Sequence, residues 1–301
     1  MTISFRDRVA IVTGAGAGLG RAYALELARR GARVVVNDLG TSRDGTGASD
    51  TAAAVVEEIA RAGGQAMASG ASVTELDQME AMVAAARERW GAVHVLVNNA
   101  GVLRDKSFAK MDMADFEFVL RTHLVGSANA ARAVWPLMRE QGYGRVLVTT
   151  SSSGLFGNFG QANYAAAKLG LVGLAKTLHL EGAKYDIRVN ALAPLAATRM
   201  TEDILPDEAF DRFTPEKVVP AALFLVSEDA PSGAIVGAGA GAFHSAWITM
   251  NRPVTLADEE MTVEGFASQW PAIARRQDTV VPETGFEQSD IILGALPGGK
   301  G

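Results

Sequence analysis

The chain has 301 residues, of which 48% are hydrophobic and 21% are charged, and its formal net charge is −6. These values are typical of a globular protein with a full core, and a negative chain without a dense run of Lys or Arg is not expected to bind nucleic acid. The chain has no cysteine, which excludes disulfides and thiolate nucleophiles, and its four histidines form no HExxH-type pair that would predict a metal site.

The N-terminal segment and the apolar stretches indicate where the protein is located. The segment MTISFRDRVAIVTG has no long apolar run behind a basic one, so it does not resemble a signal peptide. The longest apolar stretches are interrupted well short of a membrane span. We therefore expect a cytoplasmic protein that does not associate with membranes.

Short β-rich runs alternate with longer helical patterns along most of the chain. Strands are predicted at 9–13, 33–37, 65–69, 93–98, 145–150, 187–193 and 234–238. Helices are predicted at 19–30, 48–62, 74–90, 115–140, 163–183 and 215–228. Because continuously apolar strands that alternate with helices form parallel sheets covered on both faces, we predict a doubly wound α/β (Rossmann) domain with a seven-stranded parallel sheet.

The alternation of strands and helices stops near residue 244, which sets the predicted domain boundary. Residues 1–245 would form a cofactor-binding catalytic domain. The tail, 246–301, has one helical candidate at 255–270 and is too short for an independent domain. We expect this tail to be an extension packed on the main domain.

A glycine-rich turn follows the first predicted strand, in the sequence VAIVTGAGAGLGRAYALELARRGARVVVND. Gly14, Gly18 and Gly20 permit a tight turn and a close approach of the backbone. The helix that starts near Leu19 points its free N–H groups at this turn. A strand, a glycine turn and a helix in this order are typical of a site that binds the pyrophosphate of a dinucleotide. A purely structural turn is the alternative.

Asp38 ends the second predicted strand. A carboxylate at this position accepts hydrogen bonds from the adenosine ribose hydroxyls and repels a 2′-phosphate, which predicts NAD rather than NADP. Two alternatives stay open. Asp38 could cap a turn, and Arg43 could meet a 2′-phosphate.

The fourth predicted strand ends in the sequence VLVNNAG, residues 95–101. At the carboxyl edge of a parallel sheet this segment would lie over the cofactor. Asn98 and Asn99 could tie neighbouring strand ends together, and Gly101 permits close approach. A plain loop is the alternative.

Tyr164 and Lys168 are four residues apart in the sequence NYAAAK, so they share one face of a predicted helix. Ser151 follows the fifth strand, and the strand end and the helix start can converge beside the nicotinamide. Hydride transfer to or from a carbonyl carbon needs a proton donor or acceptor at the oxygen. A nearby ammonium favours the phenolate and lowers the pKa of a phenol, while Ser151 could hold the substrate oxygen. For the pair alone, a solvated lysine beside a half-buried tyrosine is the alternative.

The motifs TGAGAGLG, NNAG, Ser151 and YAAAK follow one another as they do in short-chain dehydrogenases/reductases, and the chain resembles this family from about residue 5 to residue 244. The resemblance implies that Tyr164 is the acid/base, that Lys168 lowers its pKa and holds the nicotinamide ribose, and that Ser151 positions the substrate. It also implies that the segment NALAP, with Thr198, contacts the nicotinamide carboxamide. The cofactor residues expected on these grounds are Gly14, Gly18, Leu19, Gly20, Asp38, Ser72, Val73, Asn99, Ala100, Gly101, Tyr164, Lys168, Pro194 and Thr198.

Two positions depart from the pattern of the family. An asparagine usually helps to hold a proton-relay water in the helix after NNAG, whereas the sequence RTHLVGS has His123 there. A neutral His123 could take a similar catalytic role or could be a core histidine. The third strand usually leads to an aspartate that contacts adenine, whereas SGASVT has Ala71 and Ser72, so Ser72 and the backbone are left to hold the base.

Within the family the chain is more closely similar to the (3R)-hydroxyacyl-CoA dehydrogenase units of the type 2 peroxisomal multifunctional enzymes. The similarity rests on VVVNDLG, SFAKM, THLVGS, GNFGQANYAAAKLGLVGLAKTL and VNALAPLAATRM, and extends thinly into the tail around MTVEGFASQW. It implies NAD-dependent oxidation of a (3R)-hydroxyacyl-CoA to the 3-oxoacyl-CoA. Oxidation of another secondary alcohol, such as a steroid or a cyclic alcohol, and a catalytically silent NAD-binding protein are the alternatives.

Further expectations concern the substrate and the assembly. Residues 195–215 follow a strand end with broken periodicity and would form a substrate lid. Arg199, Arg104 and Lys106 could meet CoA phosphates, with solvated surface charges as the alternative. The predicted helix 163–183 is apolar beyond one face, which together with the family resemblance predicts a homodimer or homotetramer; burial under the tail is the alternative.

Overall fold

The computed structural model of the protein describes residues 2–47, 49–197 and 212–296. The chain divides into two compact units, Met1–Ser245 and Ala246–Gly301. We call them the main unit and the C-terminal unit. The division falls at the boundary expected from the sequence, whereas packing of the tail on the main unit stays a prediction.

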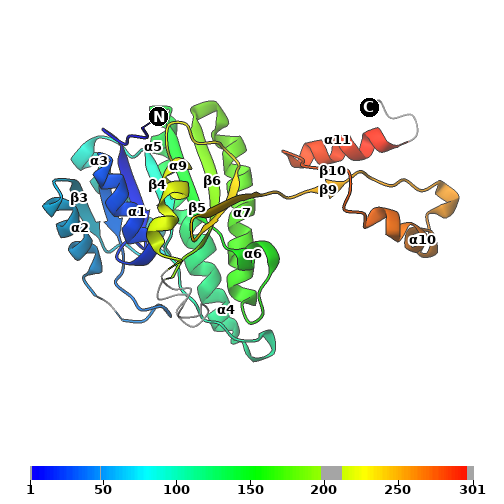
Figure 1. Ribbon diagram of the computed structural model, residues 1–301, viewed down its shortest axis with the longest axis horizontal. Coiled ribbons are helices and arrows are strands. Elements are labelled where there is room, and N and C mark those ends of the chain that lie inside the picture. Colours follow the sequence, from blue (N-terminus) through cyan, green and yellow to red (C-terminus); the bar gives the residue numbers. More distant parts are fainter. Residues whose placement is uncertain (1, 48, 198–211, 297–301) are drawn as a thin grey trace. The chain divides into compact units, whose positions relative to one another are not determined.

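Eight strands form the central sheet, in the order β3-β2-β1-β4-β5-β6-β7-β8 (Figure 1). Their bounds are β1 Val9–Thr13, β2 Arg33–Asn37, β3 Gln65–Ser69, β4 Val95–Asn98, β5 Gly144–Thr149, β6 Ile187–Leu195, β7 Ile235–Gly239 and β8 Ala242–Ala246. Neighbouring strands from β3 to β7 pair in parallel. The strand order reverses between β1 and β4, and in such sheets ligands bind at that point, beyond the carboxyl ends of the strands.

The eighth strand corrects the prediction of a seven-stranded sheet. β8 follows β7 after a turn of two residues, Ala240 and Gly241, and so short a connection can only form an antiparallel hairpin. Both residues have a positive φ, 51° and 82°, as a type I′ turn requires. The sequence does not reveal this strand because its side chains are exposed along the edge of the sheet and no face of it is apolar.

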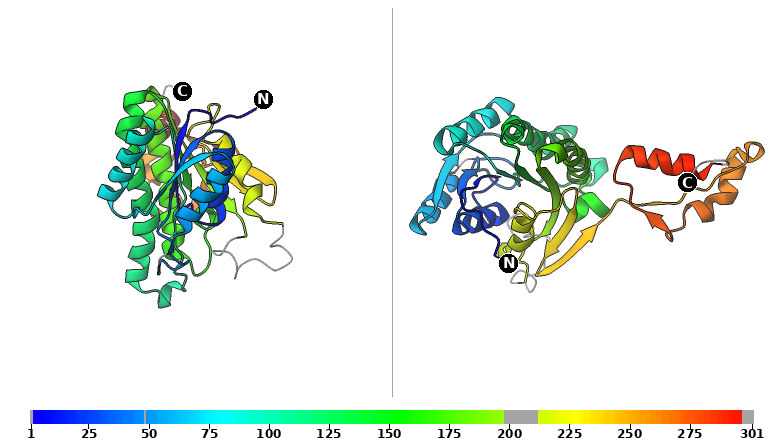
Figure 2. Two further views of the ribbon diagram at one scale, coloured as in Figure 1. Left: turned by 90° about the vertical axis from the view of Figure 1, so that its left-hand side faces the viewer. Right: turned by 90° about the horizontal axis from the view of Figure 1, so that it is seen from above.

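Helices cover both faces of the sheet (Figure 2). The helices α1, α2 and α9 pack on one another at one face, and α3, α5 and α7 do so at the other. Among the described residues of the main unit, the helices are α1 Gly18–Arg29, α2 Thr51–Arg61, α3 Leu76–Trp90, α4 Met113–Leu120, α5 Gly126–Gln141, α6 Ser152–Phe156, α7 Ala162–Gly182 and α9 Val219–Phe224. The short helix α6 is not predicted from the sequence, and the predicted helix 215–228 is a 3-10 turn at Pro215–Lys217 followed by α9.

The predicted helix 115–140 is not a continuous α-helix. Between α4 and α5 the chain makes a π-helical turn, Arg121–Val125. Such turns inside α-helices frequently occur at functional sites. This one carries His123, whose side chain is buried.

The C-terminal unit contains the helices α10 Val263–Ile273 and α11 Gly285–Ala295 and one antiparallel strand pair, β9 Met250–Asn251 with β10 Thr279–Val280. The predicted helix 255–270 corresponds to a 3-10 turn at Asp258–Glu260 and to α10. Within the described ranges of the whole chain, no helix is both long and apolar enough to cross a membrane.

Candidate active site

The glycine-rich turn lies between β1 and α1, at the point where the strand order reverses. Gly14 has a φ of 64°, and a Cβ at this position would lie 2.7 Å from the Cα of Ala100. A Cβ at Gly20 would collide with the carbonyl oxygen of Gly14. A side chain at either position would therefore displace the turn or the segment that follows β4.

Asp38 holds the same turn from the end of β2. Its Oδ2 accepts a hydrogen bond from the N–H of Gly16 at 2.7 Å, and its Oδ1 accepts one from the N–H of Gly40 at 2.6 Å. Asp38 therefore does cap a turn, which was one of the two alternatives. It also lines the pocket described below, and each carboxylate oxygen retains a further lone pair that can accept a ligand hydroxyl.

Asn99 ties the ends of β1 and β4 together, as its position in the sequence suggested. Its Nδ2 donates to the carbonyl oxygens of Thr13 at 3.1 Å and of Gly14 at 3.0 Å. The N–H groups of Asn99 and Ala100 in turn donate to Oγ1 of Thr13. These bonds hold the backbone of residues 99–101 against the glycine-rich turn.

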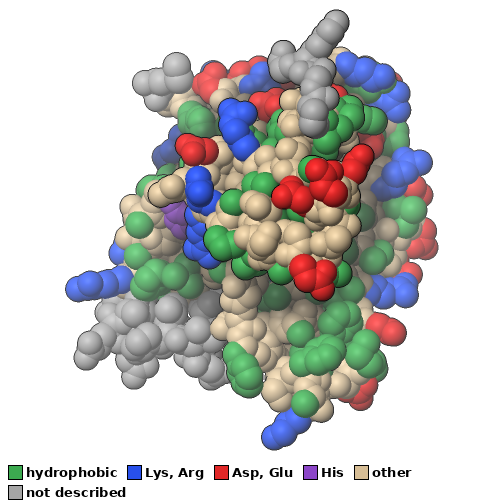
Figure 3. Space-filling view, turned by 90° about the vertical axis from the view of Figure 1, so that its right-hand side faces the viewer, with side chains coloured by type: hydrophobic (Ala, Val, Ile, Leu, Met, Phe, Trp, Pro, Cys, Tyr) green, Lys and Arg blue, Asp and Glu red, His purple; other side chains and the backbone are tan. Residues whose placement is uncertain are grey.

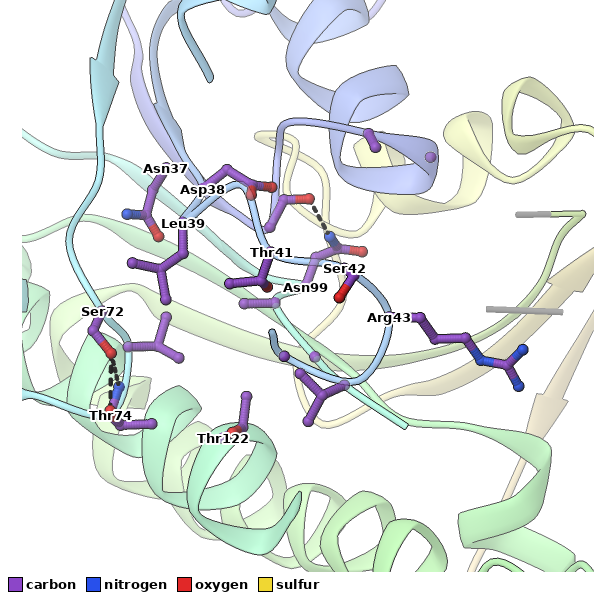
Figure 4. A pocket seen from close by; sticks show the side chains of 18 of the residues that line it. Asn37, Asp38, Leu39, Thr41, Ser42, Arg43, Ser72, Thr74, Asn99 and Thr122 are labelled. Carbon is purple, nitrogen blue, oxygen red and sulfur yellow. Dashed lines mark hydrogen bonds between the residues drawn. The ribbon is translucent and has the colours of Figure 1, made fainter. Parts of the chain in front are cut away.

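These segments line a pocket of about 520 Å³ (Figure 4). The predicted cofactor residues that line it are Gly14, Gly18, Leu19, Asp38, Ser72, Val73, Asn99, Ala100 and Gly101. A pocket of this size suits a small molecule or cofactor. The N-terminus of α1, with glycine instead of side chains in front of it, suits a pyrophosphate. The residues present therefore fit a dinucleotide.

Of the second wall of this pocket, the sequence indicated only Arg43. This wall is formed by Leu39, Thr41, Ser42, Arg43, Gly45, Val102, Phe118 and Thr122. Figure 4 shows the side chain of Arg43 directed away from Asp38, along the loop that follows β2. The glycines in the sequence RDGTG are the signal that could have indicated a shaped loop here.

Ser72 lies in the pocket, but its polar groups already have partners. Its N–H donates to Oε1 of Gln78 at 2.9 Å, and its hydroxyl is 2.8 Å from that of Thr74. The backbone N–H of Ser72 is therefore used within the protein. Whether the neighbouring backbone holds an adenine base stays a prediction.

Ser151, Tyr164 and Lys168 come together at the carboxyl end of β5. Ser151 is the N-cap of α6, and the other two lie in the first turns of α7. The Ser151 hydroxyl accepts a hydrogen bond from the N–H of Ser153 at 3.2 Å. Lys168 Nζ lies 5.3 Å from the centre of the Tyr164 ring and donates to the carbonyl oxygen of Thr149 at 2.6 Å.

Burial dominates the pKa values of Tyr164 and Lys168. Burial raises the pKa of Tyr164 to about 12. Hydrogen bonding to Ser151 lowers this pKa, and the charge of Asp105 raises it further. Burial lowers the pKa of Lys168 to about 7. Desolvation disfavours the charged form of each group, and a lowering of the pKa of Tyr164 by Lys168 stays a prediction.

His123 packs directly against Tyr164. The two rings meet edge to face with their centres 5.2 Å apart. His123 Nε2 is 2.8 Å from the carbonyl oxygen of Val102, while Nδ1 is buried without a hydrogen-bond partner among the described residues. Desolvation and the charge of Lys168 hold the pKa of His123 well below its usual value, so the ring is neutral. A donating Nε2–H would leave Nδ1 as an acceptor.

The remaining predicted residues do not line the pocket or are not described. Gly20 is buried inside the turn, and Pro194 lies on β6, paired with Ala238 of β7. Thr198 and Arg199, with most of the predicted lid 195–215, lie outside the described residues. In the part of the chain that is described, no group of three His, Asp or Glu side chains could hold a metal ion.

The profile of the short chain dehydrogenase family matches residues 8–209. Over 270 residues the chain is 52% identical to a short-chain type dehydrogenase/reductase of Mycobacterium tuberculosis, a match that covers 89% of this chain and 94% of that protein. It is 49% identical to the peroxisomal hydratase-dehydrogenase-epimerase of Saccharomyces cerevisiae over 280 residues, which are 92% of this chain and 31% of the yeast protein.

Similar folds occur among solved structures. The full-length peroxisomal multifunctional enzyme type 2 of Drosophila melanogaster matches with a TM-score of 0.83 and 35% identity, over 98% of this chain and 50% of that chain. A 7α-hydroxysteroid dehydrogenase, complexed with NADH and 7-oxo glycochenodeoxycholic acid, matches with a TM-score of 0.71 and 31% identity, over 79% of this chain and 95% of that chain. The chain thus spans about a third of the yeast protein and half of the Drosophila chain. Because the family match runs through both the glycine-rich turn and the helix of Tyr164, the chain belongs to the short-chain dehydrogenase/reductase family, oxidoreductases that act on CH–OH groups.

Proposed function

We propose that the protein is an NAD-dependent dehydrogenase that oxidises a (3R)-hydroxyacyl-CoA to the 3-oxoacyl-CoA. The observation that carries the proposal is the convergence of Ser151, Tyr164 and the buried amine of Lys168 at the carboxyl end of β5, with Lys168 Nζ 5.3 Å from the centre of the Tyr164 ring. This arrangement offers a substrate hydroxyl one group that holds its oxygen and one that exchanges its proton.

The three residues would take different roles. Ser151 accepts the N–H of Ser153, so its own hydrogen can be donated to the substrate oxygen. The phenolate of Tyr164 would take the proton of the substrate hydroxyl as the carbon loses its hydride. The dinucleotide, when bound, supplies the hydride acceptor. Lys168 is anchored by the carbonyl of Thr149 and has two further N–H groups for ribose hydroxyls.

The neutral ring of His123 supports a role in proton transfer. Its Nδ1 is buried without a hydrogen-bond partner among the described residues and lies in the ring that packs on Tyr164. A water hydrogen-bonded to Nδ1 could carry the proton away from Tyr164, in place of the water that the family usually holds with an asparagine. Because the pKa of Tyr164 is about 12, alcohol oxidation should become faster as the pH rises.

Asp38 supports NAD as the cofactor. Its carboxylate lies in the pocket at the end of β2, where it would accept the ribose hydroxyls and repel a 2′-phosphate. Gly14, Gly18 and the N-terminus of α1 would hold the pyrophosphate. The hydroxysteroid dehydrogenase with the similar fold was solved with NADH, which agrees with this choice.

The extent of the matches supports an acyl-CoA substrate. The matches to the yeast hydratase-dehydrogenase-epimerase and to the Drosophila multifunctional enzyme cover 92% and 98% of the chain, so they include part of the C-terminal unit. The match to the 7α-hydroxysteroid dehydrogenase covers only 79%. That structure nevertheless makes a steroid or cyclic alcohol the second candidate substrate.

The deciding experiment follows NADH formation from a (3R)-hydroxyacyl-CoA, with its (3S) epimer, with NADP and with a 7α-hydroxysteroid as comparisons. We expect turnover with NAD and the (3R) thioester. Tyr164→Phe should still bind NAD but lose turnover by about 10²-fold to 10⁴-fold. Tyr185→Phe is the matched control, since the Tyr185 hydroxyl is bonded to Arg139 at the surface. Full turnover by Tyr164→Phe would refute the role of Tyr164. If only the steroid is turned over, the substrate is a steroid and not the thioester.

We also propose that the protein is a homodimer or homotetramer. The helix α7 buries Leu171 and Val172 but leaves Leu169 48% and Leu180 44% exposed. Apolar side chains on the outer side of a helix are suited to contact with a second copy. Light scattering of the purified protein would give the state directly, and a monomeric mass would refute the proposal.

A further inference from the structure

The loop that follows β2 closes one side of the dinucleotide pocket. We define the cofactor loop as residues 39–47. In this loop, the backbone carbonyl of Arg43 accepts a hydrogen bond from the N–H of Leu103 at 3.0 Å. The backbone carbonyl of Asp44 accepts one from Nε of Arg104 at 3.1 Å. These two hydrogen bonds join the end of β2 to the segment after β4. Residues of both segments line the pocket.

Arg104 is itself fixed by α4. Its Nη1 donates to Oδ1 of Asp115 at 2.8 Å, and its guanidinium lies 3.9 Å from the centre of the Phe118 ring. The side chain of Arg104 is 27% exposed. Such a planar group, stacked and bonded to a carboxylate, is held in one orientation. Arg104 therefore connects the cofactor loop to α4 through a rigid contact.

Gly45 makes the contact between the cofactor loop and α4 possible. Its φ is 88°, and a Cβ at this position would lie 2.9 Å from two atoms of the Phe118 ring and 3.3 Å from Val102. Gly47 has a similar φ of 76°, but a Cβ there would meet nothing within 4 Å. The two glycines thus share the backbone conformation and differ in the contact.

The cofactor loop also has a shape of its own. Asp44 Oδ1 accepts hydrogen bonds from the hydroxyls of Ser42 and Thr46, both at 2.7 Å, and from the N–H of Thr46 at 3.0 Å. A loop with this internal structure can move as a unit when its contacts with Arg104 and Phe118 are lost. Figure 4 shows the loop running past Thr41, Ser42 and Arg43 along the edge of the pocket.

We propose that Arg104 and Gly45 hold the cofactor loop closed over the dinucleotide and so set the rate at which the cofactor leaves. The inference rests on the proposed function in taking NAD as the occupant of the pocket. The side-chain hydrogen bonds of Arg104 go to the cofactor loop and to α4, not to Ser151, Tyr164 or Lys168. Arg104 and Gly45 are positioning residues, because they act on the cofactor through the cofactor loop.

The test measures the dissociation rate of NADH by stopped-flow fluorescence, which needs no substrate. Arg104→Met removes the bond to Asp44 and the stacking on Phe118. Gly45→Ala pushes the loop away from Phe118. Each should speed NADH release about tenfold, the change that corresponds to the loss of one or two hydrogen bonds. Gly47→Ala imposes the same backbone strain without the contact and should change release less than about twofold.

The controls separate this inference from the proposed function. Arg61→Met removes a positive charge from an exposed ion pair on α2 and should leave NADH release unchanged. Unchanged release in both Arg104→Met and Gly45→Ala would overturn the inference, as would equal acceleration by Gly47→Ala. Should Arg104→Met not fold, Arg104→Lys carries the same test, because it keeps the charge and loses the planar fork. If the protein without any substitution does not bind NADH, the proposed function is refuted instead.

Discussion

Lys168 carries a buried charge whose effect on stability can be measured. The residue is 3% exposed, and burial lowers its pKa from 10.5 to about 7. The unfolded chain therefore binds this proton more tightly than the folded protein does. Stability contributed by this site is lowest below about pH 7 and rises until the pH passes about 10.5, where both states are neutral.

The magnitude follows from the two pKa values. One pKa unit corresponds to about 1.36 kcal/mol. For a group with a pKa of about 7 in the folded protein and 10.5 in the unfolded chain, the free energy of unfolding rises by about 2 kcal/mol between roughly pH 7 and pH 9. The difference in free energy of unfolding between the natural protein and Lys168→Met should move in favour of the natural protein by this amount.

The assay is urea denaturation of both proteins, without dinucleotide, at several pH values in this range. Taking the difference between them removes the contribution of the other titrating groups. Lys176→Met, on the same helix, controls for the loss of a positive charge. A difference that stays constant with pH would refute the reasoning, because Lys168 would then titrate alike in the folded and unfolded states.

Other substitutions test the core of the main unit and the surroundings of the site. Arg145 is fully buried and donates hydrogen bonds to four backbone carbonyls and one carboxylate, so Arg145→Met should lower the free energy of unfolding by about 3–5 kcal/mol in urea denaturation. A Cβ at Gly101 would collide with the ring of His123; Gly101→Ala should therefore lower the free energy of unfolding, and the additional change His123→Ser should restore part of it. The charge of Asp105 raises the pKa of Tyr164, so Asp105→Asn should shift the rise of alcohol oxidation to lower pH, by on the order of half a unit in a profile of kcat/KM.

Controls for these substitutions come from the surface of the same unit. Arg61→Met, at an exposed ion pair, should cost less than about 1 kcal/mol. A comparable loss in both arginine variants would contradict the argument from burial. No recovery in the double variant at Gly101 would mean that the clash is not with the ring. Glu117→Gln removes a charge from the exposed side of α4. If this variant shifts the pH profile of kcat/KM as much as Asp105→Asn does, Asp105 acts only through the net charge of the protein.

Features that depend on near neighbours in the chain were predictable. Most of the strand runs are largely apolar, so β1 to β7 could be placed and the parallel sheet inferred. Tyr164 and Lys168 share a helix face because they are four residues apart. The glycine-rich turn lies directly between a strand and a helix. Each of these inferences needs only the geometry of one or two consecutive elements.

The environment of those residues was decided by the tertiary structure. The cofactor loop meets Phe118 and Arg104, which follow it by some sixty residues or more, and no local pattern indicates this contact. The same applies to the pKa of Tyr164, because the burial that raises it comes from segments distant in sequence. Sequence determined which groups the protein has and which of them are neighbours along a helix or strand. Only the folded chain decided how far each group is removed from water, because desolvation depends on every segment that packs around it.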